Sequence, residues 1–415
     1  MEKAVLFVIP TLETGGAQTF LVRLATHFGK EARVYVYVIH PGSADTANEE
    51  KLAAAGIGVI HRRPSAILLR WLENRSWKKL RRLLSRIDSR TGMFTAWDRR
   101  HLKRLIRSKG IAIVNSHMYL ADSYCCRILE KYPIPIVTTL HGCYNLIVEE
   151  IARGKWDSSY VAEFTADTAY IADRLNGIVY LTDRQLSAVP ALRDAPVPKK
   201  KIYNGFMAAD PANFKPAAGA KTHWHFGMVA RGIAPKGWEQ LLLAYLQIKE
   251  KNPDKTICLS LVGDGEFLQD LKEKYSDPSI VFHGRIANPL SLMQDWDVGM
   301  LPTWFDAESL PNSVIEYLFS GLAVIATGIA EIPNMIAAGS DRAAGFLIPL
   351  TRTADGVERP QPDAIADAMQ RYIDDATLWQ THRHNASLAY APFDIRACVE
   401  SYRSFFGQVK SPNPL

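Results

Sequence analysis

Cysteine is scarce in this sequence, with five residues in 415, and none of the five forms a Cys-x-x-Cys pair. An odd number without that spacing argues against a disulfide framework and against a zinc site built from cysteine. Uninterrupted apolar runs of about 18 residues are also missing, so no transmembrane helix is predicted. The apolar stretch at 4–9 is too short, and too soon followed by glycines, for a signal peptide. We therefore expect a cytoplasmic protein with reduced thiols.

Length and composition favour two folded domains. The chain is 47% hydrophobic and 22% charged, as folded proteins are, which excludes disorder of the whole. At 415 residues it is too long for one ordinary core and fits two domains of about 200 residues each.

Positive charge is concentrated at 62–109, which holds 16 Lys or Arg against three acidic residues. Within this basic segment, Trp77, Leu80, Leu84 and Ile87 fall on one helical stripe, with basic residues on the other faces. Two interpretations stay open: a solvated helix whose stripe packs on its own domain, or docking on anionic lipid headgroups. No recognition motif accompanies the charge, so nucleic acid is not expected as a partner.

Strands and helices are predicted to alternate along the first 205 residues. The expected strands are the apolar or β-branched runs at 5–10, 34–39, 111–117, 134–142, 176–182 and 199–205. Strands separated by helical material favour a parallel sheet with helices on both faces. The predicted fold class is therefore α/β, with a doubly wound, Rossmann-like sheet.

Two features of this first half are candidates for ligand binding. Gly15 and Gly16 lie in a loop between the first strand and a helix, where the backbone can approach a ligand and the helix N-terminus favours an anion. A plain turn is an equal alternative, because the pattern is not Gly-x-Gly-x-x-Gly. His141 lies at the carboxyl end of a strand, where open α/β sheets bind ligands, and a structural histidine would fit there too.

A segment rich in Pro, Gly and Ala at 209–223 is predicted to be a linker. The pattern of strand, glycine loop and helix then begins again, with strands expected at 225–230, 256–262, 279–286 and 298–303. This repeat indicates a second Rossmann-like domain, and two such domains facing one another would leave a central cleft.

An Asp-x-Asp at Asp295 and Asp297 has the form with which many nucleotide-sugar enzymes hold a divalent metal. Here the pair closes a helix and lies at the amino end of the next strand, whereas ligands bind at the carboxyl end. A structural role is therefore predicted for it, and no metal is expected.

The segment around Glu308 and Glu316 has the chemistry of a nucleotide-sugar site. Glu308 follows a strand at its carboxyl edge, and Pro311 begins a helix whose N-terminus favours a phosphate. Asn312 or Ser313 is expected to cap that helix, and Gly321 to end it. Two carboxylates can accept hydrogen bonds from two sets of hydroxyls, with an anion between them. The alternative is a loop glutamate and a surface helix glutamate.

Arg231 and Lys236 weigh against that alternative. Both follow the first strand of the second domain, and they could neutralise a diphosphate, the guanidinium through paired hydrogen bonds and the ammonium as a point charge.

With these residues in view, the chain resembles glycosyltransferase family 4, the retaining enzymes of GT-B fold, over nearly its full length. The similar motifs are TGGAQ, TLHG, YNG, VARGIAPKG, LVGDGE and, most specifically, ESLPNSVIEYLFSGLAVIAT, with its Glu-x7-Glu spacing. Two positions depart from the family pattern: GIAEIP stands where Gly-Gly-x-x-Glu is usual, and Tyr317 where alanine is common. Both departures concern the sugar that is recognised.

The resemblance implies the roles of the candidate residues. Glu308 would contact hydroxyls of the donor sugar and Glu316 those of the ribose, while Arg231 and Lys236 would hold the diphosphate. His141 would approach the sugar from the first domain. The implied catalytic residues are Glu308, His141, Arg231 and Lys236, and the implied donor-binding residues are Gly15, Gly16, Arg231, Lys236, Arg285, Ile286, Glu308, Ser309, Leu310, Pro311, Asn312 and Glu316.

The implied domains are an acceptor-binding domain at 1–205, a donor-binding domain at 206–390, and a C-terminal helix at 391–415 that crosses back to the first domain. The implied activity is retaining transfer of a sugar from a nucleotide-diphosphate donor to a saccharide or lipid-linked acceptor, in cell-surface polysaccharide or lipopolysaccharide synthesis. No cofactor is expected. Two alternatives remain: a nucleotide-sugar epimerase or hydrolase on the same scaffold, and a non-catalytic nucleotide-sugar or membrane-binding protein.

Overall fold

The fold was determined as a computed structural model, which describes residues 4–13, 15–40, 46–62, 96–208, 221–286, 288–306 and 308–410. The chain divides into two compact units, Met1–Phe206 with Ile395–Leu415, and Met207–Asp394. The stripe from Trp77 to Ile87 lies outside the described residues, as does nearly all of the predicted linker.

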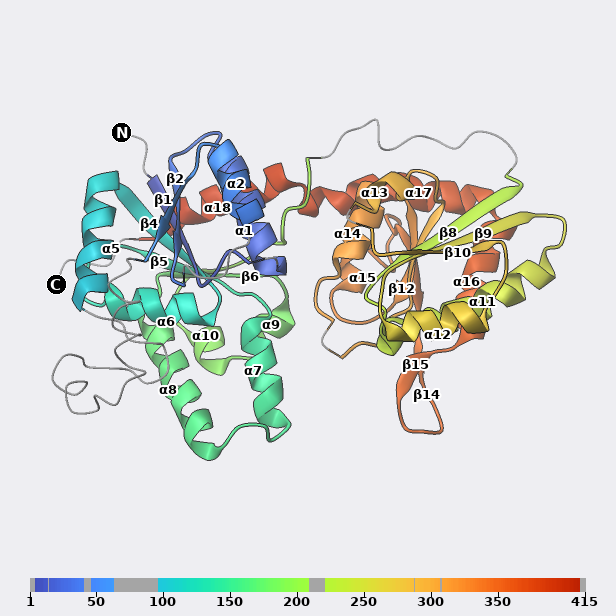
Figure 1. The fold of residues 1–415 in the computed structure, drawn as a ribbon, viewed down its shortest axis with the longest axis horizontal. Coiled ribbons are helices and arrows are strands. Elements are labelled where there is room, and N and C mark those ends of the chain that lie inside the picture. The colour runs from blue at the N-terminus through green and yellow to red at the C-terminus, as the bar shows by residue number, and fades with distance from the viewer. Residues whose placement is uncertain are drawn as a thin grey trace. The chain divides into compact units, whose positions relative to one another are not determined.

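The N-terminal unit contains a seven-stranded parallel sheet with the strand order β3-β2-β1-β4-β5-β6-β7 (Figure 1). The strands are β1 (Ala4–Ile9), β2 (Val34–Val38), β3 (Gly58–His61), β4 (Ile111–His117), β5 (Ile136–Thr139), β6 (Gly177–Tyr180) and β7 (Lys199–Lys201). Five of them fall within the predicted runs, and β1 begins one residue before its predicted run. The short edge strand β3 was not predicted, because four half-buried residues carry little periodic signal.

The helices of this unit cover the two faces of the sheet, as a doubly wound fold requires. They are α1 (Gly16–Phe28), α2 (Thr46–Ala54), α5 (Ala96–Lys109), α6 (Tyr119–Ile128), α7 (Cys143–Ala152), α8 (Ser158–Arg174), α9 (Asp183–Ser187), α10 (Pro190–Asp194) and the C-terminal α18 (Ile395–Gln408). Helix α18, red in Figure 1, lies beside α1.

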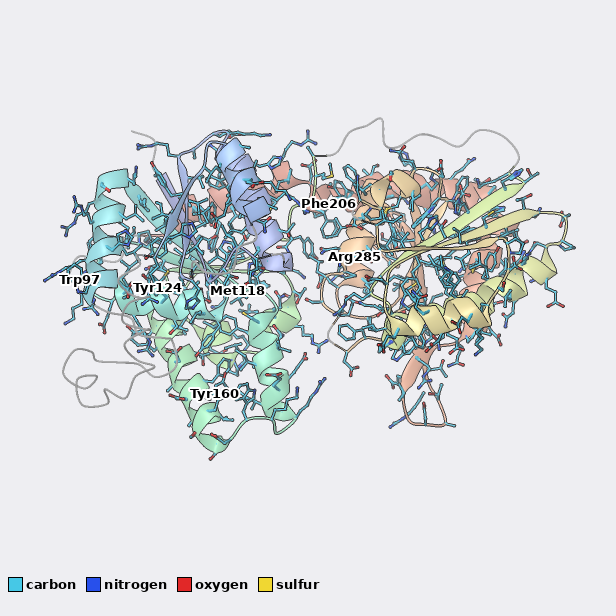
Figure 2. All side chains as sticks on the ribbon, viewed as in Figure 1. Trp97, Met118, Tyr124, Tyr160, Phe206 and Arg285 are labelled. Carbon is cyan, nitrogen blue, oxygen red and sulfur yellow. The ribbon has the colours of Figure 1, made fainter. Side chains whose placement is uncertain are left out.

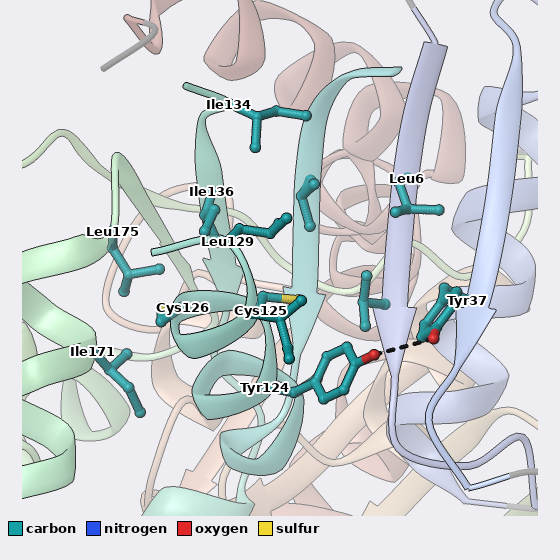
Figure 3. Close-up of a cluster of buried hydrophobic side chains, with 14 of the residues drawn as sticks. Leu6, Tyr37, Tyr124, Cys125, Cys126, Leu129, Ile134, Ile136, Ile171 and Leu175 are labelled. Atoms are coloured by element: carbon teal, nitrogen blue, oxygen red, sulfur yellow. Dashed lines mark hydrogen bonds between the residues drawn. The ribbon is translucent and has the colours of Figure 1, made fainter. Parts of the chain in front are cut away.

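The sheet separates two hydrophobic clusters. Strand β1 is buried along its whole length, and its successive side chains point to opposite faces. Leu6 and Val8 join one cluster, which is shown in Figure 3, and Phe7 and Ile9 join the other. This burial on both faces explains why the strands of a parallel sheet have continuous apolar sequences, which made them predictable.

The C-terminal unit contains a six-stranded parallel sheet with the order β10-β9-β8-β11-β12-β13. Its strands are β8 (His223–Val229), β9 (Thr256–Val262), β10 (Ile280–Gly284), β11 (Val298–Leu301), β12 (Ala323–Thr327) and β13 (Gly345–Ile348), and an antiparallel hairpin of β14 (Leu350–Arg352) and β15 (Glu358–Pro360) projects from the unit (Figure 1). The predicted second Rossmann-like domain is confirmed.

Helical segments of this unit are the 3-10 turn η2 (Ala234–Lys236), α11 (Trp238–Lys251), α12 (Glu266–Lys274), α13 (Leu290–Met293), α14 (Asn312–Phe319), α15 (Ile332–Met335), α16 (Pro362–Asp374), α17 (Ala376–Tyr390) and the 3-10 turn η3 (Ala391–Phe393). No helix within the described parts of the chain is long and apolar enough to cross a membrane.

Candidate active site

Two loops of the C-terminal unit bring the predicted donor residues together. Strand β8 leads into the loop that carries Arg231 and Lys236, and β11 leads into the loop that carries Glu308. Because β8 and β11 are parallel neighbours, both loops leave the sheet at the same carboxyl edge. Residues 72 positions apart thus meet in one site.

Lys236 and Glu308 form a buried ion pair at this edge. The ammonium Nζ donates to Oε2 of Glu308 over 2.5 Å, and each side chain is 9% exposed. The hydroxyl of Thr303 donates to the same carboxylate oxygen over 3.3 Å. Burial of the two opposite charges together avoids the cost of burying either one alone.

The backbone holds the two loops against each other. The amide of Trp304 donates to the carbonyl of Pro235 over 2.8 Å, and the Thr303 hydroxyl donates to that carbonyl over 3.1 Å. Gly237 has a φ of 86°, and a Cβ there would lie 2.0 Å from the carbonyl oxygen of Pro302. A side chain at Gly237 would therefore force the Lys236 loop away from the Glu308 loop.

Arg231 lies on the exposed side of the pair. Its guanidinium carbon is 5.1 Å from the centroid of the Phe305 ring, and Nζ of Lys236 is 4.9 Å from the same centroid. Both cations thus lie over the same aromatic ring, whose faces attract positive charge. The carbonyl of Arg231 accepts from the Trp238 indole over 2.8 Å, which fixes the backbone of this residue. An accessible guanidinium and a buried ammonium therefore share one aromatic neighbour, and both are groups that can bind an anion.

Helix α14 begins at Asn312, after Pro311, and the predicted start and the stop at Gly321 are confirmed. The capping prediction was wrong. Pro311 is the N-cap and makes no side-chain cap bond, while Asn312 and Ser313 lie inside the helix. A proline at this position needs no amide partner of its own, and the free first-turn amides favour an anion.

Glu316 lies one turn into α14 and is half-buried. The neighbouring Tyr317 sets the orientation of this helix, because its hydroxyl accepts from the amide of Val229 over 2.8 Å and donates to the carbonyl of Met300 over 3.1 Å. Tyr317 therefore ties α14 to both β8 and β11. Gly299 makes this packing possible, since a Cβ at that position would lie 2.3 Å from the tyrosine ring.

The loop before α14 is also connected to α15. The amide of Glu331 donates to the carbonyl of Ser309 over 3.2 Å, and its carboxylate accepts from Asn334 over 2.9 Å. Ser309 and Leu310 are half-buried and Pro311 is buried. Glu331 was not predicted as a site residue. The signal that could have indicated it is the Gly-x-x-Glu sequence at 328–331, directly after the strand at 323–327.

Arg285 and Ile286 follow β10, which is separated from β8 by β9. Arg285 is exposed (Figure 2), and Ile286 is half-buried. Over the described parts of the chain, Arg285 has no hydrogen bond or ion pair. The structure does not bring these two residues into contact with Lys236 or Glu308, so their role in donor binding stays a prediction.

In the N-terminal unit, the predicted glycine loop connects β1 to α1. Gly15 is the N-cap of α1 and has extended backbone with a φ of −169°. Gly16 is exposed, and a Cβ there would meet no atom within 4 Å. The loop therefore has open space on its outer side, and its conformation does not itself require Gly15.

His141 is buried beside a second histidine that was not predicted. Its Nε2 lies 3.0 Å from Nδ1 of His117, which ends β4, and the rings stack with centroids 5.2 Å apart. Nε2 of His117 lies 3.0 Å from Oδ1 of Asn115. His117 ends the strand next to that of His141, so the shared strand-end position could have indicated it.

Burial lowers the pKa of His141 to about 4. Burial also lowers the pKa of His117 well below its usual value, and the neighbouring His141 lowers it further. Both rings are therefore neutral near pH 7. Met118, which directly follows His117, has a φ of 77° and precedes α6 (Figure 2). Such backbone in a residue other than glycine is strained, and strain of this kind is concentrated at functional sites.

Asp297 has the predicted structural role. Its carboxylate accepts from the amide of His225 over 2.8 Å and pairs with Lys221 over 2.8 Å, and its carbonyl accepts from the Trp379 indole. Trp296 is buried against Gly227, where a Cβ would lie 2.1 Å from the indole. Within the described ranges, no group of three or more His, Cys, Asp or Glu side chains is placed to hold a metal ion.

The sequence matches two family descriptions. Glycosyltransferase Family 4 matches residues 14–183, and Glycosyl transferases group 1 matches residues 224–375. The first match lies in the N-terminal unit and the second in the C-terminal unit, on either side of the predicted linker. No curated protein matches the chain significantly.

Solved structures resemble the chain over its whole length. HepE of Anabaena, in complex with UDP and glucose, is 16% identical over 98% of this chain and 99% of its own, with a TM-score of 0.61. WaaG, a glycosyltransferase involved in lipopolysaccharide biosynthesis, is 14% identical over 97% and 100%, with a TM-score of 0.55. The pneumococcal O-GlcNAc transferase GtfA, in complex with UDP and GlcNAc, is 11% identical over 98% and 99%, with a TM-score of 0.62.

At these identities the likeness shows the fold, and it confirms the predicted GT-B class. The two family matches confirm the resemblance that the Glu-x7-Glu segment indicated. Enzymes of this family use a nucleotide sugar as substrate and do not require a metal cofactor. The chain therefore belongs to glycosyltransferase family 4 and is a glycosyltransferase.

Proposed function

We propose that this protein is a retaining transferase that moves a hexose from a UDP-sugar to a hydroxyl of a saccharide or lipid-linked saccharide, in the synthesis of a cell-surface polysaccharide or glycoconjugate. UDP as the donor nucleotide is supported by HepE and GtfA, both of which were solved with UDP and a sugar. Lipopolysaccharide as a product class is supported by WaaG alone.

The observation that carries this proposal is the group formed by Arg231, Lys236 and Glu308. A diphosphate fits the two cations, because the exposed guanidinium and the buried ammonium approach the same aromatic ring. A carboxylate repels phosphate and accepts hydrogen bonds from hydroxyls, so Glu308 suits the sugar next to that diphosphate. The same reasoning assigns Glu316, farther along α14, to the ribose hydroxyls.

In the proposed reaction, the bond between the anomeric carbon and the β-phosphate oxygen breaks, and its electron pair stays on the phosphate. The acceptor oxygen forms the new bond on the same face of the sugar, and its proton passes to the departing phosphate. Negative charge grows on the phosphate during this step, so Arg231, Lys236 and the N-terminus of α14 stabilise the transition state more than the ground state.

Thermal stabilisation by a panel of nucleotides and nucleotide sugars tests the donor assignment. UDP, UDP-glucose and UDP-GlcNAc should raise the melting temperature more than ADP, GDP or their sugar derivatives. Stabilisation by a purine nucleotide alone would contradict the assignment. Consumption of the donor without any acceptor would instead favour an epimerase or hydrolase.

Glu316 offers a sharper test of the donor orientation. The wild-type protein should bind UDP more tightly than 2′-deoxy-UDP, since a carboxylate left without its hydroxyl partner weakens binding. Glu316→Ala should remove most of this difference, as measured by calorimetry. An unchanged preference for the ribonucleotide in the variant would place the ribose elsewhere.

We further propose a cytoplasmic location with peripheral contact to an anionic membrane through the basic segment at 62–109. Its described part, helix α5, carries Trp97, which is 64% exposed, and these exposed basic residues: Arg99, Arg100, Arg104, Arg107 and Lys109. Each basic side chain near such a surface contributes about 1 kcal/mol. Sedimentation with vesicles containing phosphatidylserine should be strong at low salt and weak at high salt. Equal sedimentation with neutral vesicles would contradict this contact.

A further inference from the structure

A chain of buried hydrogen bonds runs from His141 into the sheet of the N-terminal unit. It passes from His141 to His117 and on to Asn115, three residues that are 6%, 0% and 0% exposed. The ring of Phe20 lies 6.0 Å from that of His141 and 6.4 Å from that of His117, measured between centroids. His117 is fully buried, so its hydrogen bonds depend on protein groups.

The side chain of Asn115 can take only one orientation. One of its terminal atoms lies 2.9 Å from the carbonyl oxygen of Val137 on β5. A carbonyl oxygen only accepts hydrogen bonds, so the atom that faces it must be the amide nitrogen. The carbonyl oxygen Oδ1 of Asn115 must therefore face His117.

This orientation sets the protons on both imidazoles. Because Oδ1 of Asn115 is an acceptor, Nε2 of His117 carries a hydrogen and donates it. A neutral imidazole has a single N–H group, which leaves Nδ1 of His117 as an acceptor. That atom faces Nε2 of His141, so Nε2 of His141 carries the hydrogen of this pair. The lone pair of His141 is then on Nδ1.

We propose that Asn115 and His117 are positioning residues that hold His141 as the tautomer protonated at Nε2, so that its Nδ1 offers a lone pair to a hydroxyl group of the ligand. Across the parts of the chain that the structure describes, Nδ1 of His141 has no hydrogen-bond partner. The inference rests on the proposed function only in naming a sugar hydroxyl as that ligand group.

The tautomer decides which group of the ligand can form a hydrogen bond with His141. A lone pair on Nδ1 accepts a hydrogen from a hydroxyl and repels a phosphate oxygen. An N–H at the same atom would do the reverse and attract the phosphate. The fixed tautomer therefore directs His141 to a hydroxyl group rather than to a phosphate.

Nitrogen NMR of the ¹⁵N-histidine-labelled protein tests the tautomer without any substrate. The chain has 11 histidines, and the spectra of His117→Gln and His141→Gln assign two of them by the loss of a signal. We expect Nε2 of both residues to appear as protonated nitrogens and Nδ1 of both as unprotonated nitrogens at pH 7. A protonated Nδ1 on His141 would overturn the inference, whatever the activity.

Variants of the positioning residues test the consequence for transfer. His117→Leu breaks the chain and should lower kcat with UDP-glucose on the order of 10-fold to 100-fold, because the reacting groups lose their alignment. His117→Gln can still accept from His141 and donate to Asn115, so it should restore part of that loss. Asn115→Leu should release the tautomer, with signal for a protonated Nδ1 on His141.

The affinity for UDP separates this inference from the proposed function. UDP lacks the sugar that is transferred, so its dissociation constant should be unchanged in His117→Leu. Equal kcat in the leucine and glutamine variants would overturn the positioning role. If no UDP-sugar is bound or consumed by the wild type, the proposed function fails, while the NMR result still decides the tautomer.

Discussion

The ammonium of Lys236 lies 2.5 Å from a carboxylate oxygen of Glu308, and the two side chains are equally buried. Each residue is therefore the partner that allows the other to be charged inside the unit. The same two residues are assigned to the donor, one to its diphosphate and the other to its sugar. Stability and donor binding are thus coupled at this pair, and suitable variants can separate them.

Removal of one partner should cost more than removal of both. Glu308→Ala leaves Lys236 as a buried cation without its carboxylate, at a cost of about 3–5 kcal/mol in the free energy of unfolding. Glu308→Gln keeps an acceptor oxygen and should cost less. The double variant Lys236→Met with Glu308→Leu should recover most of the stability, because an apolar pair of similar volume needs no neutralisation.

Unfolding in urea, followed by tryptophan fluorescence, measures these differences. All three variant proteins should have lost transfer activity by at least about 100-fold, since the groups that stabilise the transition state are altered. If the double variant were no more stable than Glu308→Ala, the ion pair would not be the source of the coupling between stability and donor binding.

Arg231 should affect donor affinity without affecting stability. Its side chain is exposed, so Arg231→Ala should change the free energy of unfolding by less than about 0.5 kcal/mol. Hydrogen bonds to a charged group contribute about 1.5–3 kcal/mol, so the dissociation constant of UDP should rise about 10-fold or more. Calorimetry measures both the variant and a matched control, Lys251→Ala, at the far end of α11. A similar loss in the control would indicate a general charge effect.

The sequence allowed the prediction of elements and residues that carry a local signal. Central strands such as β1 and β11 are buried along their whole length and are apolar throughout. The helix from Asn312 is marked by the preceding proline and by Gly321. The pairing of Lys236 with Glu308 could not be predicted, because only the adjacency of β8 and β11 brings the two loops together.

The chain of hydrogen bonds through Asn115, His117 and His141 could not be predicted, for a related reason. Asn115, His117 and His141 come from two strands that are adjacent in the sheet and separated by α6 in the chain. Each is an ordinary polar residue in its own segment, and the chemistry arises from the register of β4 with β5. Short elements such as β3 and the β14–β15 hairpin were missed because three or four residues show no period.

Asp122 should make the N-terminal unit less stable as the pH rises. Burial raises the pKa of this carboxyl to about 7, although hydrogen bonds from Ser116 (2.5 Å) and Tyr144 (2.7 Å) act in the opposite direction. The unfolded chain releases the same proton near pH 4. Between about pH 4 and pH 7, the folded protein keeps a proton on Asp122 that the unfolded chain has released. The stability contributed by Asp122 is therefore lost as the pH rises from about 4 to 7.

Asp122→Asn removes this titration. The unfolding free energy of the wild type minus that of the variant should fall by a few kcal/mol between pH 4 and pH 7, and should be constant above pH 8. The depressed pKa of His141 acts in the opposite direction over part of this range, but it is common to both proteins and cancels. Asp173→Asn, at an exposed position of α8, is the control for the same substitution outside the core.

Tyr402 should stabilise the C-terminal helix without setting the histidine tautomer. Its hydroxyl lies 3.2 Å from that of Thr139, and the ring is fully buried beside Phe20. Tyr402→Phe removes one buried hydrogen bond and should cost about 1 kcal/mol, whereas Ser404→Ala, which deletes an exposed hydroxyl of the same helix, should cost little.

The nitrogen spectrum of Tyr402→Phe then tests whether Tyr402 contributes to the tautomer of His141. Asn115 is oriented by the carbonyl of Val137, and that backbone bond remains in the variant. The signals of His117 and His141 should therefore match those of the wild type, while the urea midpoint falls. A protonated Nδ1 on His141 in this variant would mean that α18, through Tyr402 and Thr139, also determines which nitrogen of His141 carries the hydrogen.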